Sequence, residues 1–456
     1  MSPRSLFDPP GILSREDAES LTKRILGMAK ADETRVTIIG GVRGNTRFAV
    51  NQISTGGDNT NTTVSVRSTF GSKSASTTTN KLDDASLQAA VDLSERLAKL
   101  APEDPEAMPE LGAQTYQESP AWNAVTANLD PAGRAAAVRS VTEPSRAAKF
   151  AATGYIESDA SAHAIATNKG LFAYARETNS SMTTTVRAPD GSASGWAGAA
   201  HTNWSRIDPD ALGARAIDKA RASANPVAIE PGRYTVVLEP TAVGNLVQLI
   251  AFSLNARNAD EGRSFFTKQG GGNKIGLKVV DERVSIVSDP FDPDAAALPF
   301  TPEGEPAKKT TWIENGIVRN LAYDRYWAQK QGKEPTPLVG SLRMSGGTQS
   351  IEDLIASTQR GILVTRFWYI RPVDPRTILF TGLTRDGTFL IEDGKITKAV
   401  KNLRYNESPV FMLNNLEAMG QPVRVSASED GSPGFAIVVP PIKAHDFNFT
   451  SLSDAV

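Results

Sequence analysis

The amino-acid sequence predicts an α+β fold, in which an N-terminal α/β domain is followed by a C-terminal β-rich domain, an antiparallel sheet or barrel with one buried helix. Three observations lead to this prediction. At 456 residues the chain is long enough for two domains. Groups of helix-like and strand-like segments alternate over its first half. In the second half, one strongly apolar helix at residues 241–254 precedes a run of strand-like segments at residues 364–416.

The first predicted element is a helix that begins after Ser14. Acidic side chains cluster there, at the positive end of a helix dipole, and apolar residues recur at helical spacing to about residue 31. The segments that then read as strands are residues 35–39, 46–53, 62–68 and 74–79, with a turn at residues 40–45. A helix over residues 84–100 presents leucine and valine side chains on one broad face. This order is typical of an α+β domain.

The rest of the first half continues this pattern. Residues 101–120 are rich in proline and glutamate and read as an irregular connection. Helices are expected at residues 131–142 and 208–223, with strands between them at residues 149–157, 163–168, 170–178 and 180–187. Residues 225–232 contain two prolines and are the predicted domain boundary, which divides the chain into residues 1–227 and 228–456.

The C-terminal half is predicted to be mostly β-structure. A strand at residues 234–238 leads into the apolar helix. Further strands are expected at residues 278–288, 309–314, 317–322, 365–370, 377–381, 388–391, 395–400 and 434–439. Two of the connections are tight turns, because Asn315-Gly316 and Asp393-Gly394 tolerate the positive φ angles of a type I′ hairpin.

The composition excludes several classes of function. The net charge of −2 argues against nucleic-acid binding and membrane-surface binding, because both require a basic surface. The absence of cysteine excludes disulfides, thiolate nucleophiles and cysteine-containing metal sites. Residues 1–17 lack the apolar core of a signal peptide, and no apolar run approaches the roughly 20 residues that a membrane-spanning helix needs. We therefore expect a cytoplasmic protein that binds neither nucleic acid nor membranes.

Two segments carry a resemblance to a known family. Residues 365–396 read TRFWYIR-x-VDPRT-x-LFTGLTRDGTFLIEDGKI, and NLRYNESP follows at residues 402–409. This long, ordered match resembles the C-terminal signature of the TldD/PmbA family of zinc-peptidase-related proteins. NTRFAVNQIST, at residues 45–55, resembles the N-terminal hairpin of the same family.

The resemblance also predicts where catalytic residues should lie. Catalytic members of the family carry His-Glu-x-x-x-His on the helix after the first C-terminal strand, and a distant cysteine. Two imidazoles and a thiolate hold zinc, which lowers the pKa of a bound water to about 7. Here the corresponding stretch is GNLVQLIAFSLNARN, which places Gln248, Leu249 and Ser253 at the three motif positions. Residues 241–259 contain no histidine or glutamate, so we expect no catalytic residue and no metal in this chain.

This pattern resembles the PmbA (TldE) members, which lack the motif and pair with a TldD-type catalytic subunit. The resemblance therefore implies a non-catalytic subunit in a heterodimer or larger metalloprotease assembly, with zinc in the partner and extended unfolded or modified peptides as substrates. Two alternatives to this subunit role remain open: the chain could be a metallopeptidase with an unrecognised metal site, or a homodimeric peptide-binding protein without a protease partner.

Five residues are candidates for substrate binding. Trp196, His201 and Trp204 lie within one short polar segment, which suits a wall that contacts a peptide. Arg366 and Arg371 lie in the signature block and are candidates to bind a peptide carboxylate or an acidic partner. The competing structural interpretations are tryptophans packed at a sheet edge and ion pairs that stabilise the fold.

Overall fold

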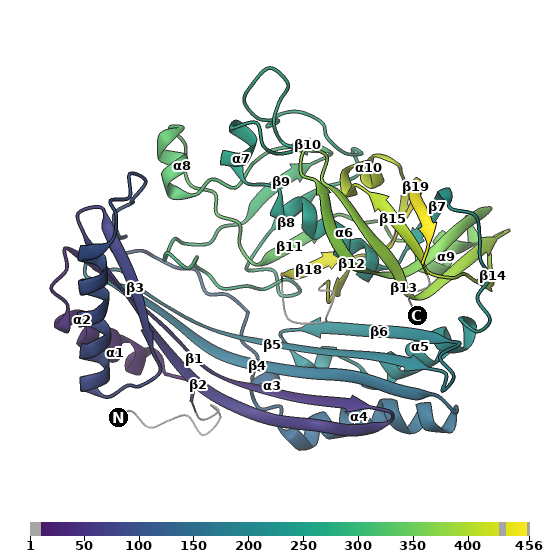
Figure 1. Ribbon diagram of the computed structural model, residues 1–456, viewed down its shortest axis with the longest axis horizontal. Helices are drawn as coiled ribbons and strands as arrows, with labels where there is room; N and C mark the ends of the chain where they lie inside the picture. The colour runs from purple at the N-terminus through teal and green to yellow at the C-terminus, as the bar shows by residue number, and fades with distance from the viewer. Residues whose placement is uncertain (1–10, 428–434, 454–456) are drawn as a thin grey trace.

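The computed structural model describes residues 11–427 and 435–453. Figure 1 shows a long, curved N-terminal sheet with helices on one side and the C-terminal half of the chain on the other. The predicted α+β class is confirmed. Residues 1–10, in which no signal peptide was expected, lie outside the described residues, as does residue 434, the first residue of the last predicted strand. The division at residues 227 and 228 stays a prediction.

The N-terminal sheet contains six antiparallel strands in the order β3-β2-β1-β4-β5-β6. Its strands are β1 (Glu33–Ala49), β2 (Gln52–Phe70), β3 (Lys73–Thr79), β4 (Ala151–Thr167), β5 (Phe172–Arg187) and β6 (Ser194–His201). β3 pairs only with residues 64–70 of β2, so residues 52–61 of β2 have no strand on their outer side within the described chain, and their side chains are exposed.

The strands of this sheet are longer than predicted. The expected turn at residues 40–45 is wrong, because β1 runs straight through its glycines and turns instead at Val50 and Asn51. Gly41 is needed for close approach rather than for a turn, since a Cβ there would lie 2.5 Å from the Ala160 carbonyl oxygen. Four strands were expected over residues 149–187, but the structure has two longer ones, β4 and β5. The small residues between the expected strands stay in extended conformation and keep the pairing between strands.

Helices cover one face of the sheet (Figure 1). They are α1 (Arg15–Met28), α2 (Asp84–Leu100), α3 (Ala124–Ala127), α4 (Pro131–Ala147) and α5 (Pro209–Ala222). Side chains alternate along β4, so Ile156 and Ala164 pack into the helical cores while Ile165 contacts Phe300 of the C-terminal half. The opposite, concave face of the sheet is therefore the one that meets the C-terminal half.

The C-terminal half is built around a closed five-stranded barrel, as the barrel-like prediction expected. Around the barrel the strands are β12 (Arg360–Asp374), β7 (Gly232–Leu238), β19 (Ile442–Leu452), β15 (Leu403–Glu407) and β13 (Leu379–Glu392), and β13 pairs back to β12. β14 (Lys395–Ala399) extends β13 through a turn at Asp393 and Gly394, both with positive φ, which confirms the predicted hairpin.

A second six-stranded sheet packs beside the barrel. Its strands are β10 (Ile317–Val318), β9 (Thr310–Glu314), β8 (Ile286–Ser288), β11 (Ser341–Met344), β18 (Ala436–Val439) and β17 (Val423–Val425). The strand predicted over residues 278–288 shrinks to β8, because Asp281 and Arg283 form a hydrogen-bonded turn before it. The short elements are η1 (Trp204–Arg206), α7 (Ala256–Asp260), α8 (Arg325–Lys330), α9 (Ile351–Ala356), α10 (Pro409–Asn414) and β16 (Leu416–Met419).

The predicted buried helix is α6 (Pro240–Phe252), which lies in the largest hydrophobic core, between the barrel and the second sheet. Within residues 11–427 and 435–453, no helix combines the length and apolar character that crossing a membrane requires.

Candidate functional site

Helix α6 holds the three positions at which the family resemblance expects metal chemistry. Pro240 occupies its first turn and Gly244 faces the second sheet, where a Cβ would lie 2.8 Å from Val425 Cγ2. Leu249 is only 9% exposed and belongs to the core. The Ser253 hydroxyl donates back to the Leu249 carbonyl, at 2.8 Å. Leu249 and Ser253 therefore make only the packing contacts and hydrogen bonds that are ordinary for a buried helix.

Gln248 is held by the segment that follows β17. Its amide Nε2 donates to the Ala427 carbonyl at 2.9 Å and to the Asn245 carbonyl at 3.3 Å. Asn245 donates to the same Ala427 oxygen at 2.6 Å, and its Oδ1 accepts from the backbone N–H of Phe367 at 3.1 Å. Two side-chain amides therefore tie α6 to the second sheet and to the barrel.

The residues at these positions do not fit a zinc ion. An amide that is already donating, an aliphatic side chain and a hydroxyl supply none of the imidazole, thiolate or carboxylate ligands that zinc prefers. Across the described ranges, no group of three or more His, Cys, Asp or Glu side chains is arranged to hold a metal ion. Leu249, moreover, has no atom that accepts a proton from water.

Trp196 and Arg366, two of the predicted binding residues, meet where the N-terminal sheet contacts the barrel. Trp196 lies on β6 and is 5% exposed. The Arg366 guanidinium, from β12, lies 4.7 Å from the centre of the Trp196 ring and 5.2 Å from that of Trp368. Its Nη2 donates to Asp386 Oδ2, on β13, at 2.6 Å. A buried cation is thus enclosed by two aromatic rings and a carboxylate.

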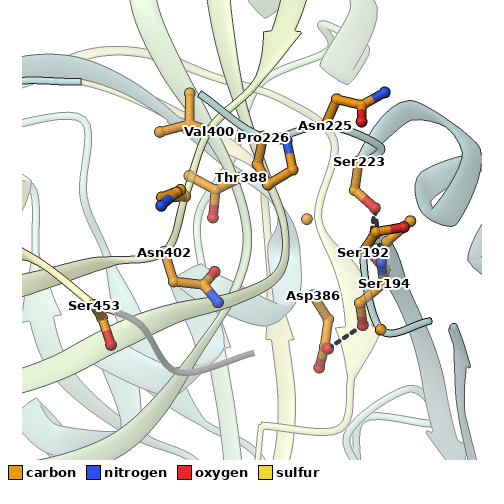
Figure 2. Close-up of a pocket in the computed structure, with 14 residues that line it drawn as sticks. Ser192, Ser194, Ser223, Asn225, Pro226, Asp386, Thr388, Val400, Asn402 and Ser453 are labelled. Atoms are coloured by element: carbon orange, nitrogen blue, oxygen red, sulfur yellow. Dashed lines mark hydrogen bonds between the residues drawn. The ribbon is translucent and has the colours of Figure 1, made fainter. Parts of the chain in front are cut away.

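Asp386 is the centre of this contact, which we call the Asp386 latch (Ser194, Arg366, Asp386). Asp386 is 4% exposed, and Ser194 of β6 donates to its Oδ1 at 2.5 Å. Figure 2 shows this bond at the edge of a cavity of about 340 Å³ that residues of both β6 and β13 line. Burial by itself raises the pKa of Asp386, but the charge of Arg366 and the Ser194 hydroxyl outweigh burial, so the pKa lies below its ordinary value.

A second, half-buried pair joins the same two halves of the chain. Lys219 of α5 donates to Glu239, at the N-terminus of α6, with an Nζ–Oε2 distance of 2.7 Å. Thr365 of β12 donates to the other Glu239 oxygen at 3.3 Å. Burial lowers the pKa of Lys219, and the neighbouring Glu239 carboxylate opposes that shift. Neither residue was singled out from the sequence, because their pairing depends on contacts between distant segments.

The Asp386 latch gives a pH-dependent prediction. The folded pKa of Asp386 lies below the unfolded value of about 3.9, so its contribution to stability is complete above that value and is lost as the pH falls through the folded pKa. We expect the difference in unfolding free energy between the wild type and Asp386→Asn to be largest at neutral pH and to shrink below about pH 4. Urea titrations across this range measure it, and a difference independent of pH would contradict the prediction.

The other predicted binding residues lie apart from the latch. His201 ends β6. Trp204, in η1, packs against the core between α4 and α5, and its backbone N–H donates to the Thr126 hydroxyl oxygen at 2.7 Å. Arg371 is exposed on β12, with its guanidinium 4.2 Å from the centre of the Tyr369 ring. The structure therefore brings Trp196 and Arg366 together and leaves Trp204 and Arg371 elsewhere.

Sequence reasoning missed a histidine network on the concave face of the sheet. His163 Nε2 lies 3.0 Å from Glu177 Oε1 and 3.1 Å from Ser161 Oγ, and the Ser161 hydroxyl lies 3.1 Å from Asp159 Oδ1. In a Ser-His-acid triad, the serine and the acid contact different ring nitrogens. Here both approach Nε2, so the geometry does not make Ser161 a nucleophile.

Two domain descriptions of one protein family match this chain. Residues 80–224 match the PmbA/TldA metallopeptidase central domain, and residues 231–451 match the PmbA/TldA metallopeptidase C-terminal domain. Among curated relatives, a metalloprotease of Methanothermobacter thermautotrophicus is 27% identical over 256 residues, which are 51% of this chain and 53% of the relative. A metalloprotease TldD homolog of Buchnera aphidicola is 27% identical over 209 residues, 42% of each chain. The chain thus spans about half the length of these relatives.

Solved structures match over almost the whole chain. TldE from Thermococcus kodakarensis superposes with a TM-score of 0.82 at 18% identity, covering 96% of this chain and all of that one. A putative modulator of a DNA gyrase from Thermotoga maritima superposes with a TM-score of 0.80 at 18% identity, covering 95% and 100%. At these identities the likeness shows the fold.

Proposed function

Because its two halves match the central and C-terminal domains of one family, this chain belongs to the PmbA/TldD family of metallopeptidase-like proteins, and we propose that it is a non-catalytic, TldE-like subunit of a two-subunit metalloprotease. The observation that carries this proposal is the chemistry of α6. Gln248, Leu249 and Ser253 stand at the motif positions, and their side chains are used in packing and hydrogen bonds of the fold.

The proposed division of labour follows from this chemistry. A TldD-like partner holds zinc and activates water, in a heterodimer or larger assembly, and this chain contributes no metal ligand. The substrates are unfolded or modified peptides in extended form. The cytoplasmic location expected from the sequence remains part of this proposal, as does the absence of nucleic-acid binding.

The role of this chain is to form one wall of the peptide groove. β6 is the last strand of its sheet, with β5 as its neighbour in the described chain, and its residues Gly198, Ala199 and Ala200 are small and half-buried. Ser223 and Lys219 bond the β6 backbone at Ser194 and Trp196, so the peptide pairs with the edge at residues 198–200. There an extended peptide gains main-chain hydrogen bonds that do not depend on its sequence. Such pairing suits a protease that accepts many unfolded peptides.

A mixing experiment tests the proposal. We expect the purified chain alone to cleave no peptide, and the chain mixed with its motif-bearing relative from the same organism to cleave an unstructured peptide faster than the relative alone. The matched control is the relative with its motif glutamate changed to glutamine, which should form the same complex without activity.

Two results would overturn the subunit assignment in favour of the alternatives. One tightly held zinc per chain, whose removal by a chelator abolishes cleavage by this chain alone, would identify an independent metallopeptidase. Purification from the native cell with only copies of itself, and no relative carrying the motif, would identify a homodimeric peptide-binding protein.

A further inference from the structure

An open groove of about 830 Å³ lies where the N-terminal half meets the outer surface of the barrel. Helix α5 lines it from the N-terminal half, and α9 with strands β12, β13 and β14 lines it from the C-terminal half. Figure 1 shows α5, α9 and β14 together at the right-hand end of the molecule. The volume is within the range of about 300–1,000 Å³ that is typical of ligand sites.

The lining of this groove is mainly apolar, although the groove is open to solvent. Leu363 and Phe389, from β12 and β13, belong to a hydrophobic cluster of the barrel. Ile351 and Ile355 of α9 pack against this cluster and remain partly exposed. Ile396 of β14 is 45% exposed. Single exposed apolar side chains are common, but a concave surface that gathers several of them is typical of a binding site.

The charges in the lining favour neither an acidic nor a basic ligand. Two are positive and three are negative; they belong to Arg215, Lys219, Asp218, Glu239 and Glu352. Lys219 pairs with Glu239 at 2.7 Å, and Asp218 pairs with Arg221 at 3.1 Å. These pairs leave Arg215 and Glu352, one charge of each sign, so the groove has no strong net field. An uncharged apolar ligand suits such a surface.

One end of the groove meets the edge of β6 at which peptide pairing is proposed. Lys219 lines the groove, and its Nζ lies 3.4 Å from the Trp196 carbonyl oxygen, on the outer side of β6. Only two residues, or about 7 Å of strand, separate Trp196 from Gly198. Val423 of β17 also lines the groove, and β17 packs against β6. A peptide that runs along the edge from Ala200 toward Gly198 therefore continues into the groove.

Lys219 is placed to hold the main chain of a peptide at this junction. Its ammonium group has three N–H donors. Among the described residues it has two acceptors, Glu239 Oε2 at 2.7 Å and the Trp196 carbonyl at 3.4 Å. Since the side chain is 13% exposed, the third N–H is available to a peptide carbonyl. This contact is independent of peptide sequence, whereas the apolar lining beyond it distinguishes side chains.

We propose that this groove binds large aliphatic or aromatic side chains of the extended peptide that pairs with β6. The inference rests on the proposed function, and it adds the class of substrate: peptides that carry apolar residues beside the strand-paired segment. The occupant is the peptide because the groove continues from the strand edge. Folded proteins bury most large apolar residues, so an unfolded chain is what offers both an extended backbone and these side chains. The groove thus gives a physical basis for selecting unfolded substrates.

Peptide binding to the full chain without its partner tests the groove. The probes are three uncharged peptides with acetylated and amidated ends: Thr-Gly-Thr-Leu-Phe-Leu, Leu-Phe-Leu-Thr-Gly-Thr and Thr-Gly-Thr-Ser-Ser-Ser. We expect the better of the two apolar peptides to bind at least about tenfold more tightly than the serine peptide, because burial of one leucine-sized side chain corresponds to about that factor. The preferred order of the two gives the direction of the bound chain. Equal binding of the apolar and serine peptides, or no binding at millimolar concentration, would overturn the proposal.

A bulky side chain in the groove locates the binding. Ala214 is exposed on α5 and lines the groove, so Ala214→Trp should lower the affinity for the apolar peptide at least about tenfold. The matched control is Ala136→Trp, at an exposed alanine of α4 outside the lining, which should bind as the wild type does. Should Ala214→Trp fail to fold, Ile396→Ser should lower that affinity about fivefold and leave the serine peptide unaffected. Equal effects in the groove variants and the control would contradict the proposal.

The same variants separate this groove from other occupants and from the subunit assignment. If Ala214→Trp leaves peptide binding intact but prevents association with the motif-bearing relative or with a second copy, the groove is a subunit interface and the peptide proposal is wrong. If the mixed subunits cleave apolar and serine peptides at the same rate and this chain binds both alike, the groove assignment fails and the subunit role stands. If the subunits do not associate while the wild type, but not Ala214→Trp, prefers the apolar peptide, the subunit role is wrong and the groove stands.

Discussion

Replacing Asp386 with asparagine is expected to lower the free energy of unfolding by about 3–5 kcal/mol, because it leaves the buried Arg366 guanidinium without a counter-charge. Asparagine has nearly the shape of aspartate and tolerates the left-handed backbone of this position, where φ is 53°, so the substitution isolates the charge. Urea denaturation measures the loss.

The matched control is Asp218→Asn, which breaks an exposed ion pair with Arg221 at 3.1 Å. Exposed pairs contribute little, so this control should change the unfolding free energy by at most about 1 kcal/mol. The double variant Arg366→Met with Asp386→Asn should recover part of the loss, because no charge then remains buried. A single Asp386→Asn variant within about 1 kcal/mol of the wild type would show that the latch does not hold the two halves together.

The second large effect is expected at the position where the family motif has its glutamate. Leu249→Glu should destabilise the chain by about 4 kcal/mol or more, because it removes a core side chain and buries a carboxyl group without a partner. Phe252→Glu is the control on the same helix, since Phe252 is 57% exposed and should lose only about 1 kcal/mol with its ring contact to Phe435.

The outcome of this comparison bears on function. If Leu249→Glu folds as well as the control, the surroundings of α6 still accept a charged group, and the view that this site has become core would be wrong. Thermal unfolding followed by circular dichroism distinguishes the two results.

The parts of the fold that could be predicted from the sequence are those set by local pattern. The apolar run after β7 identified α6 to within two residues, and the Asp393-Gly394 turn was found from its dipeptide alone. Barrel closure, by contrast, depends on the pairing of β12 with β13 and of β7 with β19, which no local pattern encodes. The glycines of β1 led to the wrong prediction of a turn at residues 40–45, because glycine is favoured both in turns and where two strands approach closely.

The candidate site divides in the same way. Gln248, Leu249 and Ser253 were located because the family resemblance places its motif on the helix that follows the first C-terminal strand. Asp386 was missed, although it lies inside the signature block, because its role depends on Ser194 and Arg366 arriving from other strands.

The bare outer side of β2 has a consequence for how this protein behaves on its own. Among the described residues, no strand pairs with the outer side of residues 52–61, and this stretch carries no proline or lysine, the residues that commonly blunt such edges. An isolated copy therefore presents a template for self-stacking. Its polar side chains and two glycines, which make poor fibre-forming sequence, are what restrain aggregation.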